Sequence, residues 1–155
     1  MRALLRAVAL AALATAASGA DERKNYYDDP FVQVTSGLAA CPVPEAPLMT
    51  EAEARAQFHV RSERGLRCYL EGRCRLSSSY MYDKDIIARV QKAVTVNGGF
   101  KDTSVWALGQ RRWVFLKGCV NSKAQSKALE QLVGSIDEVE RVVNELRVSP
   151  ASRGR

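Results

Sequence analysis

The sequence predicts an α+β fold for its second half, in which two helices pack on one face of a three-stranded sheet. Two apolar stripes have the spacing of helices, and three segments have the alternating apolar residues of strands. They follow one another as helix, strand, strand, helix, strand, an αββαβ order. Two amphipathic helices need a shared apolar surface, and one face of such a sheet supplies it. For the first half of the chain, the sequence predicts only a cysteine-containing segment with one short helix.

The two predicted helices begin at capping residues and end near glycines. Asp83 can cap the first helix, which residues 97–99 (Asn-Gly-Gly) end. Ser122 with Gln125 forms a capping box for the second helix, and Gly134 lies near its end. The apolar stripes are Ile86, Ile87, Val90, Ala93 and Val94 in the first helix and Ala128, Leu129, Leu132, Val133 and Ile136 in the second.

The three predicted strands cover about 105–108, 113–120 and 139–148, with residues 109–112 as the turn between the first two. Side chains alternate between the two faces of a strand, so each strand offers one face to the helices. The inward face is predicted to carry Val105, Ala107, Val114, Leu116, Gly118, Val120, Val142, Asn144, Leu146 and Val148. The outward face is predicted to carry Trp106, Trp113, Phe115, Lys117, Cys119, Arg141, Val143, Glu145 and Arg147.

Residues 1–20 are predicted to be a cleaved signal peptide, which implies export to a periplasm. A basic start precedes an uncharged run at 7–17, and small residues precede a cleavage site between Ala20 and Asp21. The run is too short for a typical membrane span, although an uncleaved anchor is the alternative. The full chain has a net charge of +6, and losing Arg2 and Arg6 with the signal leaves +4. This modest positive charge favours anionic partners such as lipid head groups, and export argues against nucleic acid.

The rest of the chain is predicted to divide into residues 21–80, residues 81–149 and a disordered tail at 150–155. Residues 21–80 are expected to be largely irregular, with three prolines within 41–47. Thr50 and Glu53 match a capping box that opens a short helix over about residues 51–60. A basic loop or small hairpin is expected over residues 61–75. Residues 81–149 are predicted to form the α+β domain.

The four cysteines predict two disulfide bonds, because an exported protein matures in an oxidising compartment. Three connectivities are possible. The favoured one joins Cys68 to Cys74 across a short turn and leaves Cys41 to pair with Cys119. A four-cysteine zinc site and a redox-active dithiol are weaker alternatives, since the chain has no C-x-x-C pair.

The second half resembles the BON domain. Residues 114–120 (VFLKGCV) are similar to its V-x-L-x-G-x-V core, and residues 139–148 (VERVVNELRV) are similar to its closing V-x-x-V-x-N-x-L-x-V strand. The resemblance implies an exported, non-enzymatic module that associates with phospholipid membranes or with envelope proteins. It also implies that Leu116 and Val142 lie in the core and that Gly118 lets helix and sheet approach closely. The turn at 109–112 looks about two residues longer than the family's usual turn.

The outward face of the sheet is the candidate binding surface. Two tryptophans and a phenylalanine exposed together would form an unusual apolar patch, and nearby arginines suit lipid phosphates. The alternative is that residues 21–80 fold over this face, because a bond from Cys119 to Cys41 would draw them across it. The candidate lipid- or partner-binding residues are Trp106, Arg111, Arg112, Trp113, Phe115, Arg141 and Arg147.

No catalytic residue, metal site, cofactor or small-molecule substrate is predicted. The single histidine, His59, has no partner histidine and no nucleophile beside it in the sequence. The sequence has neither a phosphate-binding glycine loop nor a serine elbow. The leading hypothesis is therefore a non-enzymatic module that binds anionic phospholipid surfaces, and the alternative is a module that docks another envelope protein.

Overall fold

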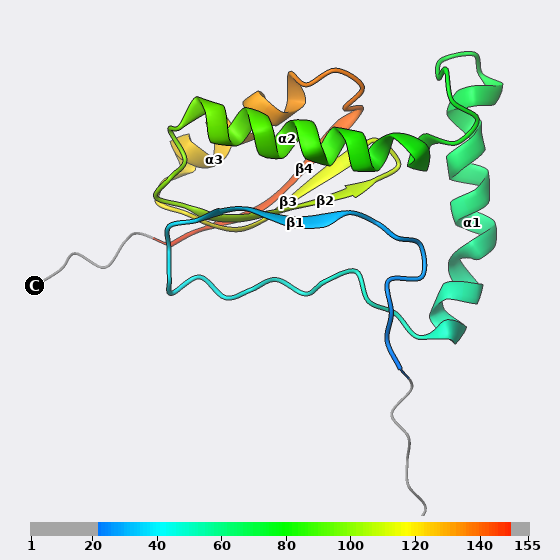
Figure 1. Cartoon of the computed structure of the whole chain (residues 1–155), viewed down its shortest axis with the longest axis horizontal. Coiled ribbons are helices and arrows are strands. Elements are labelled where there is room, and N and C mark those ends of the chain that lie inside the picture. The colour runs from blue at the N-terminus through cyan, green and yellow to red at the C-terminus, as the bar shows by residue number, and fades with distance from the viewer. Residues whose placement is uncertain (1–21, 150–155) are drawn as a thin grey trace, which may run out of the picture.

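The computed structural model describes residues 22–149, which form a four-stranded mixed sheet with helices on one face and one helix at its end (Figure 1). The predicted signal peptide and the tail lie outside these residues. In chain order the elements are β1 (Phe31–Ser36), α1 (Glu51–Leu70), the 3-10 helix η1 (Ser79–Tyr82), α2 (Asp83–Asn97), β2 (Ser104–Gln110), β3 (Trp113–Val120), α3 (Lys123–Gly134) and β4 (Arg141–Val148).

The predicted αββαβ domain is confirmed by α2, β2, β3, α3 and β4. The strands lie in the order β1-β2-β3-β4, with β2 antiparallel to β3 and β4 parallel to β3. Helices α2 and α3 cover one face of the sheet (Figure 1). Val114, Leu116 and Val120 are fully buried under these helices, and Val142 and Leu146 pack against the same core.

A fourth strand comes from the segment that was expected to be irregular. β1 pairs antiparallel with β2, and its Val32 and Val34 pack against the core of the domain. The Thr35 and Thr103 hydroxyls are 2.8 Å apart and hydrogen bonded. The alternation of Phe31-Val32-Gln33-Val34 was too short to predict a strand by itself, and it becomes one because β2 offers a free edge.

Helix α1 is twice as long as predicted. Thr50 and Glu53 form the expected capping box, but the helix continues through the predicted basic loop to Leu70. Its buried stripe explains this continuation, because Ala54, Arg61, Gly65 and Cys68 recur at helical spacing and face the rest of the molecule. Because this stripe contains the charged residue Arg61, its apolar periodicity is interrupted in the sequence.

Arg61 is buried in an ion pair that fastens α1 to the domain. Its guanidinium pairs with Asp29, and the two side chains are 6% and 2% exposed. The same guanidinium stacks on the rings of Tyr27, at 3.9 Å, and Tyr80, at 4.6 Å. Asp29 also accepts a hydrogen bond from the Gln110 side chain at the end of β2. The pair therefore joins α1 to the segment before β1, to η1 and to the end of β2.

Both favoured disulfide bonds are present. Cys41 is bonded to Cys119 across 78 residues, and Cys68 is bonded to Cys74 at the end of α1. In the chain-entropy model, a loop as long as the first contributes on the order of 4 kcal/mol to stability.

Gly118 has a different role from the one implied by the family resemblance. Its φ is +115°, and a Cβ atom there would lie 2.2 Å from the Ser104 carbonyl oxygen and 3.1 Å from the Trp106 ring. The close approach is thus to β2 and to the outward face of the sheet rather than to a helix.

Within residues 22–149, none of the helices has both the length and the apolar character needed to cross a membrane.

Replacing Arg61 with alanine should destabilise the protein strongly, because it leaves the Asp29 carboxylate buried without its cation. We expect a loss of about 3–5 kcal/mol in the free energy of unfolding. Arg55→Ala is the matched control, because Arg55 lies on the same helix and pairs with Glu51 at the surface. It should cost no more than about 0.5 kcal/mol. Urea unfolding of the oxidised protein measures both, and equal small losses would contradict the role given to Arg61.

Candidate functional site

The candidate site lies on the face of the sheet opposite α2 and α3. The structure divides this face into a covered half over β1 and β2 and an open half over β3 and β4. The segment that follows β1 runs along the covered half (Figure 1).

The covered half contains Trp106, which is only 7% exposed. It packs in a small cluster with Cys41 and Cys119, against which Phe31 and Leu38 also pack. The Cys41–Cys119 disulfide thus holds the N-terminal segment on the Trp106 ring. The expectation that residues 21–80 fold over the face is met here, so Trp106 is not available to a surface of any kind.

The open half centres on Trp113, whose ring lies between two arginines. The guanidinium carbon of Arg111 is 4.4 Å from the ring centroid, and that of Arg141 is 4.9 Å away. Phe115 lies beside it, with ring centroids 6.5 Å apart. Both aromatic side chains are half-buried, and Arg141 and Arg147 are exposed. We call Arg111, Trp113, Phe115, Arg141 and Arg147 the aromatic-basic face.

Positive charge and hydrogen-bond donors on this face lack acidic partners. Among residues 22–149, Arg111, Arg141 and Arg147 form no ion pair. The Trp113 Nε1 atom is buried without an acceptor in the same part of the chain. Lys117 is different, because it pairs with Glu145 at 3.6 Å. Because the Trp113 Nε1 atom is buried, the donors that this face offers to a ligand are the three guanidinium groups, for which an anion is the natural complement.

The β2–β3 turn presents Arg111 to this face. β2 extends to Gln110, which pairs with Trp113, so the turn consists of two residues and not of the four predicted. Arg111 and Arg112 have φ values of 60° and 63°, the left-handed conformation that a two-residue hairpin turn requires and that arginine rarely adopts. A compensating interaction is needed to hold them there.

Asp83 supplies that interaction. The backbone N–H groups of Arg111 and Arg112 each donate to one oxygen of the Asp83 carboxylate at 2.7 Å. The prediction that Asp83 caps α2 is wrong, since no side chain caps that helix. The carboxylate accepts from the turn amides instead, because the turn lies directly beside the start of α2. Burial raises the pKa of Asp83 to about 6, although the two amide hydrogen bonds favour the charged form.

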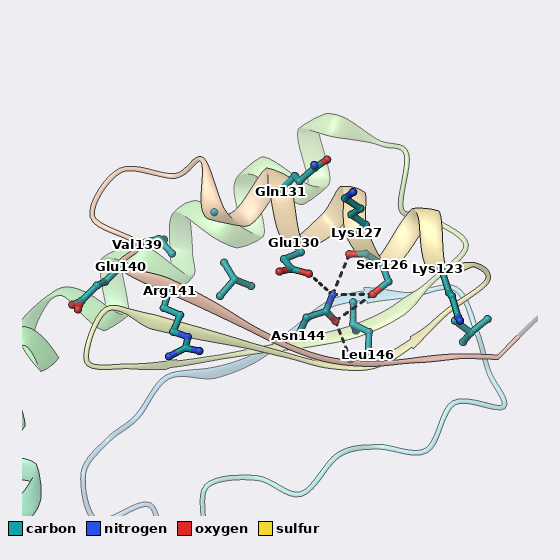
Figure 2. Close-up of a pocket in the computed structure, with 13 residues that line it drawn as sticks. Lys123, Ser126, Lys127, Glu130, Gln131, Val139, Glu140, Arg141, Asn144 and Leu146 are labelled. Carbon is teal, nitrogen blue, oxygen red and sulfur yellow. Dashed lines mark hydrogen bonds between the residues drawn. The ribbon is translucent and has the colours of Figure 1, made fainter.

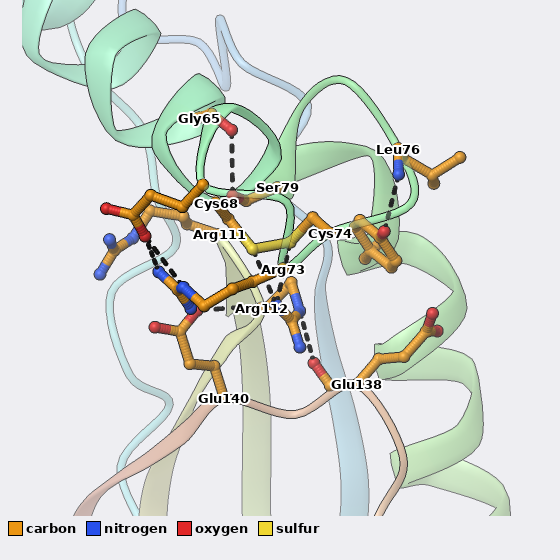
Figure 3. Close-up of polar contacts among 12 residues, drawn as sticks. Gly65, Cys68, Arg73, Cys74, Leu76, Ser79, Arg111, Arg112, Glu138 and Glu140 are labelled. Carbon is orange, nitrogen blue, oxygen red and sulfur yellow. Dashed lines mark hydrogen bonds and ion pairs between the residues drawn. A yellow bond between two sulfur atoms is a disulfide. The ribbon is translucent and has the colours of Figure 1, made fainter.

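Arg112 points away from the aromatic-basic face and into the molecule. Its Nη1 atom lies 3.0 Å and 3.2 Å from the sulfur atoms of Cys74 and Cys68, and its Nε donates to the Glu138 carbonyl oxygen at 2.9 Å (Figure 3). Its side chain is 16% exposed. Arg112 thus joins the Cys68–Cys74 loop to the residues just before β4, and it is not part of the aromatic-basic face.

Arg111 also borders a groove on α1. The groove has a volume of about 530 Å³, and its lining residues are Arg111, Glu63, Arg64, Leu66, Arg67, Leu70 and Glu71. Arg64 has no ion-pair partner within residues 22–149. Residues 61–75 were predicted to form a loop or small hairpin, but Arg64 and Arg67 lie on α1, where helical spacing brings them beside the β2–β3 hairpin.

Residues 22–149 contain no cluster of three or more histidine, cysteine, aspartate or glutamate side chains placed to hold a metal ion. His59 is exposed on α1, where its imidazole lies 3.3 Å from the Glu63 carboxylate.

The raised pKa of Asp83 predicts how stability changes with pH. The folded pKa of about 6 lies above the ordinary value of 3.8, so the folded state binds the proton more tightly. The free energy of unfolding contributed by this group is therefore highest below pH 4 and falls as the pH rises through 6, by roughly 3 kcal/mol at most. Asp83→Asn cannot titrate and keeps only one acceptor oxygen.

The difference in unfolding free energy between the native protein and Asp83→Asn isolates this contribution, because other carboxylates titrate in both. We expect the native protein's advantage to grow as the pH is lowered from 8 to 4. Urea titrations at several pH values measure it. A difference that stays constant over this range would contradict the assignment.

Comparison with protein families identifies the second half of the chain. The family model described as "BON domain" matches residues 82–150. No curated protein and no solved structure gives a significant match. The matched range contains α2, β2, β3, α3 and β4, and therefore all of the aromatic-basic face. Residues 82–150 of this chain are a BON domain, a binding module of a family that is associated with phospholipid membranes.

Proposed function

We propose that this protein is a non-enzymatic module that binds anionic phospholipid surfaces through the aromatic-basic face. The observation that supports this most directly is the Trp113 ring held between Arg111 and Arg141. The half-buried Trp113 indole offers an apolar ring surface, which suits the boundary between acyl chains and head groups. Guanidinium groups beside it suit the phosphates.

The arginines keep their charge available for a ligand. Exposed ion pairs elsewhere on the surface consume much of the positive charge, as in Arg55 with Glu51 and Arg73 with Glu71. Three arginines of the aromatic-basic face have no such partner within residues 22–149. Each basic residue near an anionic membrane contributes about 1 kcal/mol to binding at low salt. The net attraction is therefore modest and should weaken as salt is added.

We also propose that the protein is exported to the periplasm and that residues 21–80 act with the BON domain as one unit. Two disulfide bonds are typical of proteins that mature outside the reducing cytosol. β1, α1 and the segment held by Cys41 all pack against the domain, which supports a single functional body rather than a domain with a free linker.

A protein partner in the envelope is the second candidate. A groove of about 530 Å³ separates the N-terminal segment from the open half of the face, and Val43 at its rim is 74% exposed. A groove between two parts of the protein fits a segment of a partner protein better than it fits a flat bilayer. A partner that stays bound at high salt, where lipid electrostatics are screened, would favour this candidate.

Co-sedimentation of oxidised residues 21–155 with vesicles tests the lipid proposal. We expect binding to phosphatidylglycerol vesicles that weakens with salt and little binding to phosphatidylcholine vesicles. Arg111→Ala/Arg141→Ala removes two charges and both cation–π contacts of Trp113, so it should weaken binding roughly 30-fold.

Lys92→Ala/Lys127→Ala is the matched control, because it removes the same charge from exposed positions on α2 and α3, on the opposite side of the sheet. It should change binding only slightly. Equal losses in the two double variants would mean that net charge alone drives binding, and no binding to anionic vesicles would refute the proposal.

A further inference from the structure

β4 forms an open edge of the sheet. It pairs with β3 over eight consecutive residues, and no strand within residues 22–149 covers its other side. The opposite edge, β1, is shorter and carries an irregularity between Gln33 and Thr35. Bulges and short strands protect an edge from pairing with another chain, so β4 is the less protected of the two.

The backbone of β4 offers hydrogen-bonding groups outward. Ser149 N–H donates to the Val120 carbonyl oxygen on the β3 side, whereas Leu146 N–H donates to the side-chain oxygen of Asn144, two residues earlier in the same strand. Successive residues of a strand alternate in direction, so Leu146, Asn144 and Val142 share the outward direction. The Asn144 side chain accepts from the Leu146 N–H, and the outward peptide groups of Val142 and Asn144 remain open to another strand.

A groove runs beside this edge, between β4 and α3 (Figure 2). Its volume is about 770 Å³. Asn144 crosses its floor and donates to the Ser126 hydroxyl at 2.9 Å and to the Glu130 carboxylate at 2.8 Å. These contacts hold β4 firmly under α3. Arg141 points away from α3, to the other face of the sheet (Figure 2).

We propose that β4 pairs antiparallel with β4 of a second copy of this chain, with Val143 opposite its own copy. In this register Val142 and Asn144 of one chain are opposite Asn144 and Val142 of the other, and their outward peptide groups exchange hydrogen bonds. The two sheets become one continuous eight-stranded sheet.

Charge selects this register. It places Arg141 opposite Glu145 of the second copy, twice by symmetry, and Glu145 lies beside Lys117 within its own chain. If the register shifts so that Asn144 lies opposite its own copy, Arg141 lies opposite Arg147 twice. A further shift in the same direction places Glu145 opposite its own copy. If the register shifts the other way, so that Val142 lies opposite its own copy, Arg141 and Glu145 lie opposite Val143 and Val139. Opposite charges facing across strands are favourable and like charges unfavourable.

The two-fold axis of such a pair is perpendicular to the sheet, so both aromatic-basic faces point to the same side. The proposal does not depend on lipid binding, because its readout is self-association in the absence of lipid.

Sedimentation velocity of oxidised residues 21–155 tests the proposal over a wide range of concentration. The native protein should form a dimer as concentration rises. Arg141→Glu and Glu145→Arg each create two like-charge pairs and should weaken dimerisation at least about tenfold. Mixing these two variants restores both pairs as opposite charges, so the mixture should form a heterodimer, and the double variant Arg141→Glu/Glu145→Arg should form a homodimer again.

Arg147→Glu is the control, since Arg147 faces Val139 in this register, and it should dimerise like the native protein. Far-UV circular dichroism confirms that each variant is folded. A native protein that stays monomeric overturns the proposal, and so does a dimer that neither single substitution weakens or that mixing does not rescue.

Discussion

The two hydrogen bonds from the Arg111 and Arg112 amides to the Asp83 carboxylate determine how the rest of the surface is arranged. They hold two arginines in a left-handed turn that neither residue favours, and they fix the β2–β3 hairpin to the start of α2. One arginine is thereby directed outward onto Trp113 and the other inward to the Cys68–Cys74 loop. A buried carboxylate that was available as a helix cap is used instead to position the side chains of a surface.

The same corner of the molecule contains the Asp29–Arg61 pair. Asp29 accepts from Gln110, the residue before the turn, and the charge of Asp29 helps to raise the pKa of Asp83. Two buried acids and one buried arginine therefore surround the hairpin end, and each comes from a different segment. The first half of the chain contributes to the geometry of the BON domain through charges as well as through β1 and the long disulfide.

Periodicity explains which features were predictable. The stripes of α2 and α3 and the alternation in β3 and β4 were visible because apolar residues repeat there without interruption. The disulfide pairs followed from spacing, since Cys68 and Cys74 are close in the chain. The predicted length of α1 was too short because the buried stripe contains Arg61, whose burial depends on Asp29 thirty-two residues earlier. The candidate surface was found in part: the alternation placed Trp113, Phe115 and Arg141 correctly, but only three-dimensional contacts cover Trp106 and turn Arg112 inward.

The Cys41–Cys119 bond connects a residue outside the matched family range to one inside it. A fragment cut at Tyr82 would keep both helices and β2 to β4, but it would lose the strand and the loop that this bond anchors. β2 would become a second free edge, and Trp106 would be uncovered beside an unpaired thiol. Non-specific binding to membranes, proteins or other copies would then arise from the surface exposed by the cut. Binding measured on such a fragment would report these newly exposed groups, whereas in the oxidised chain with its first half attached they are covered.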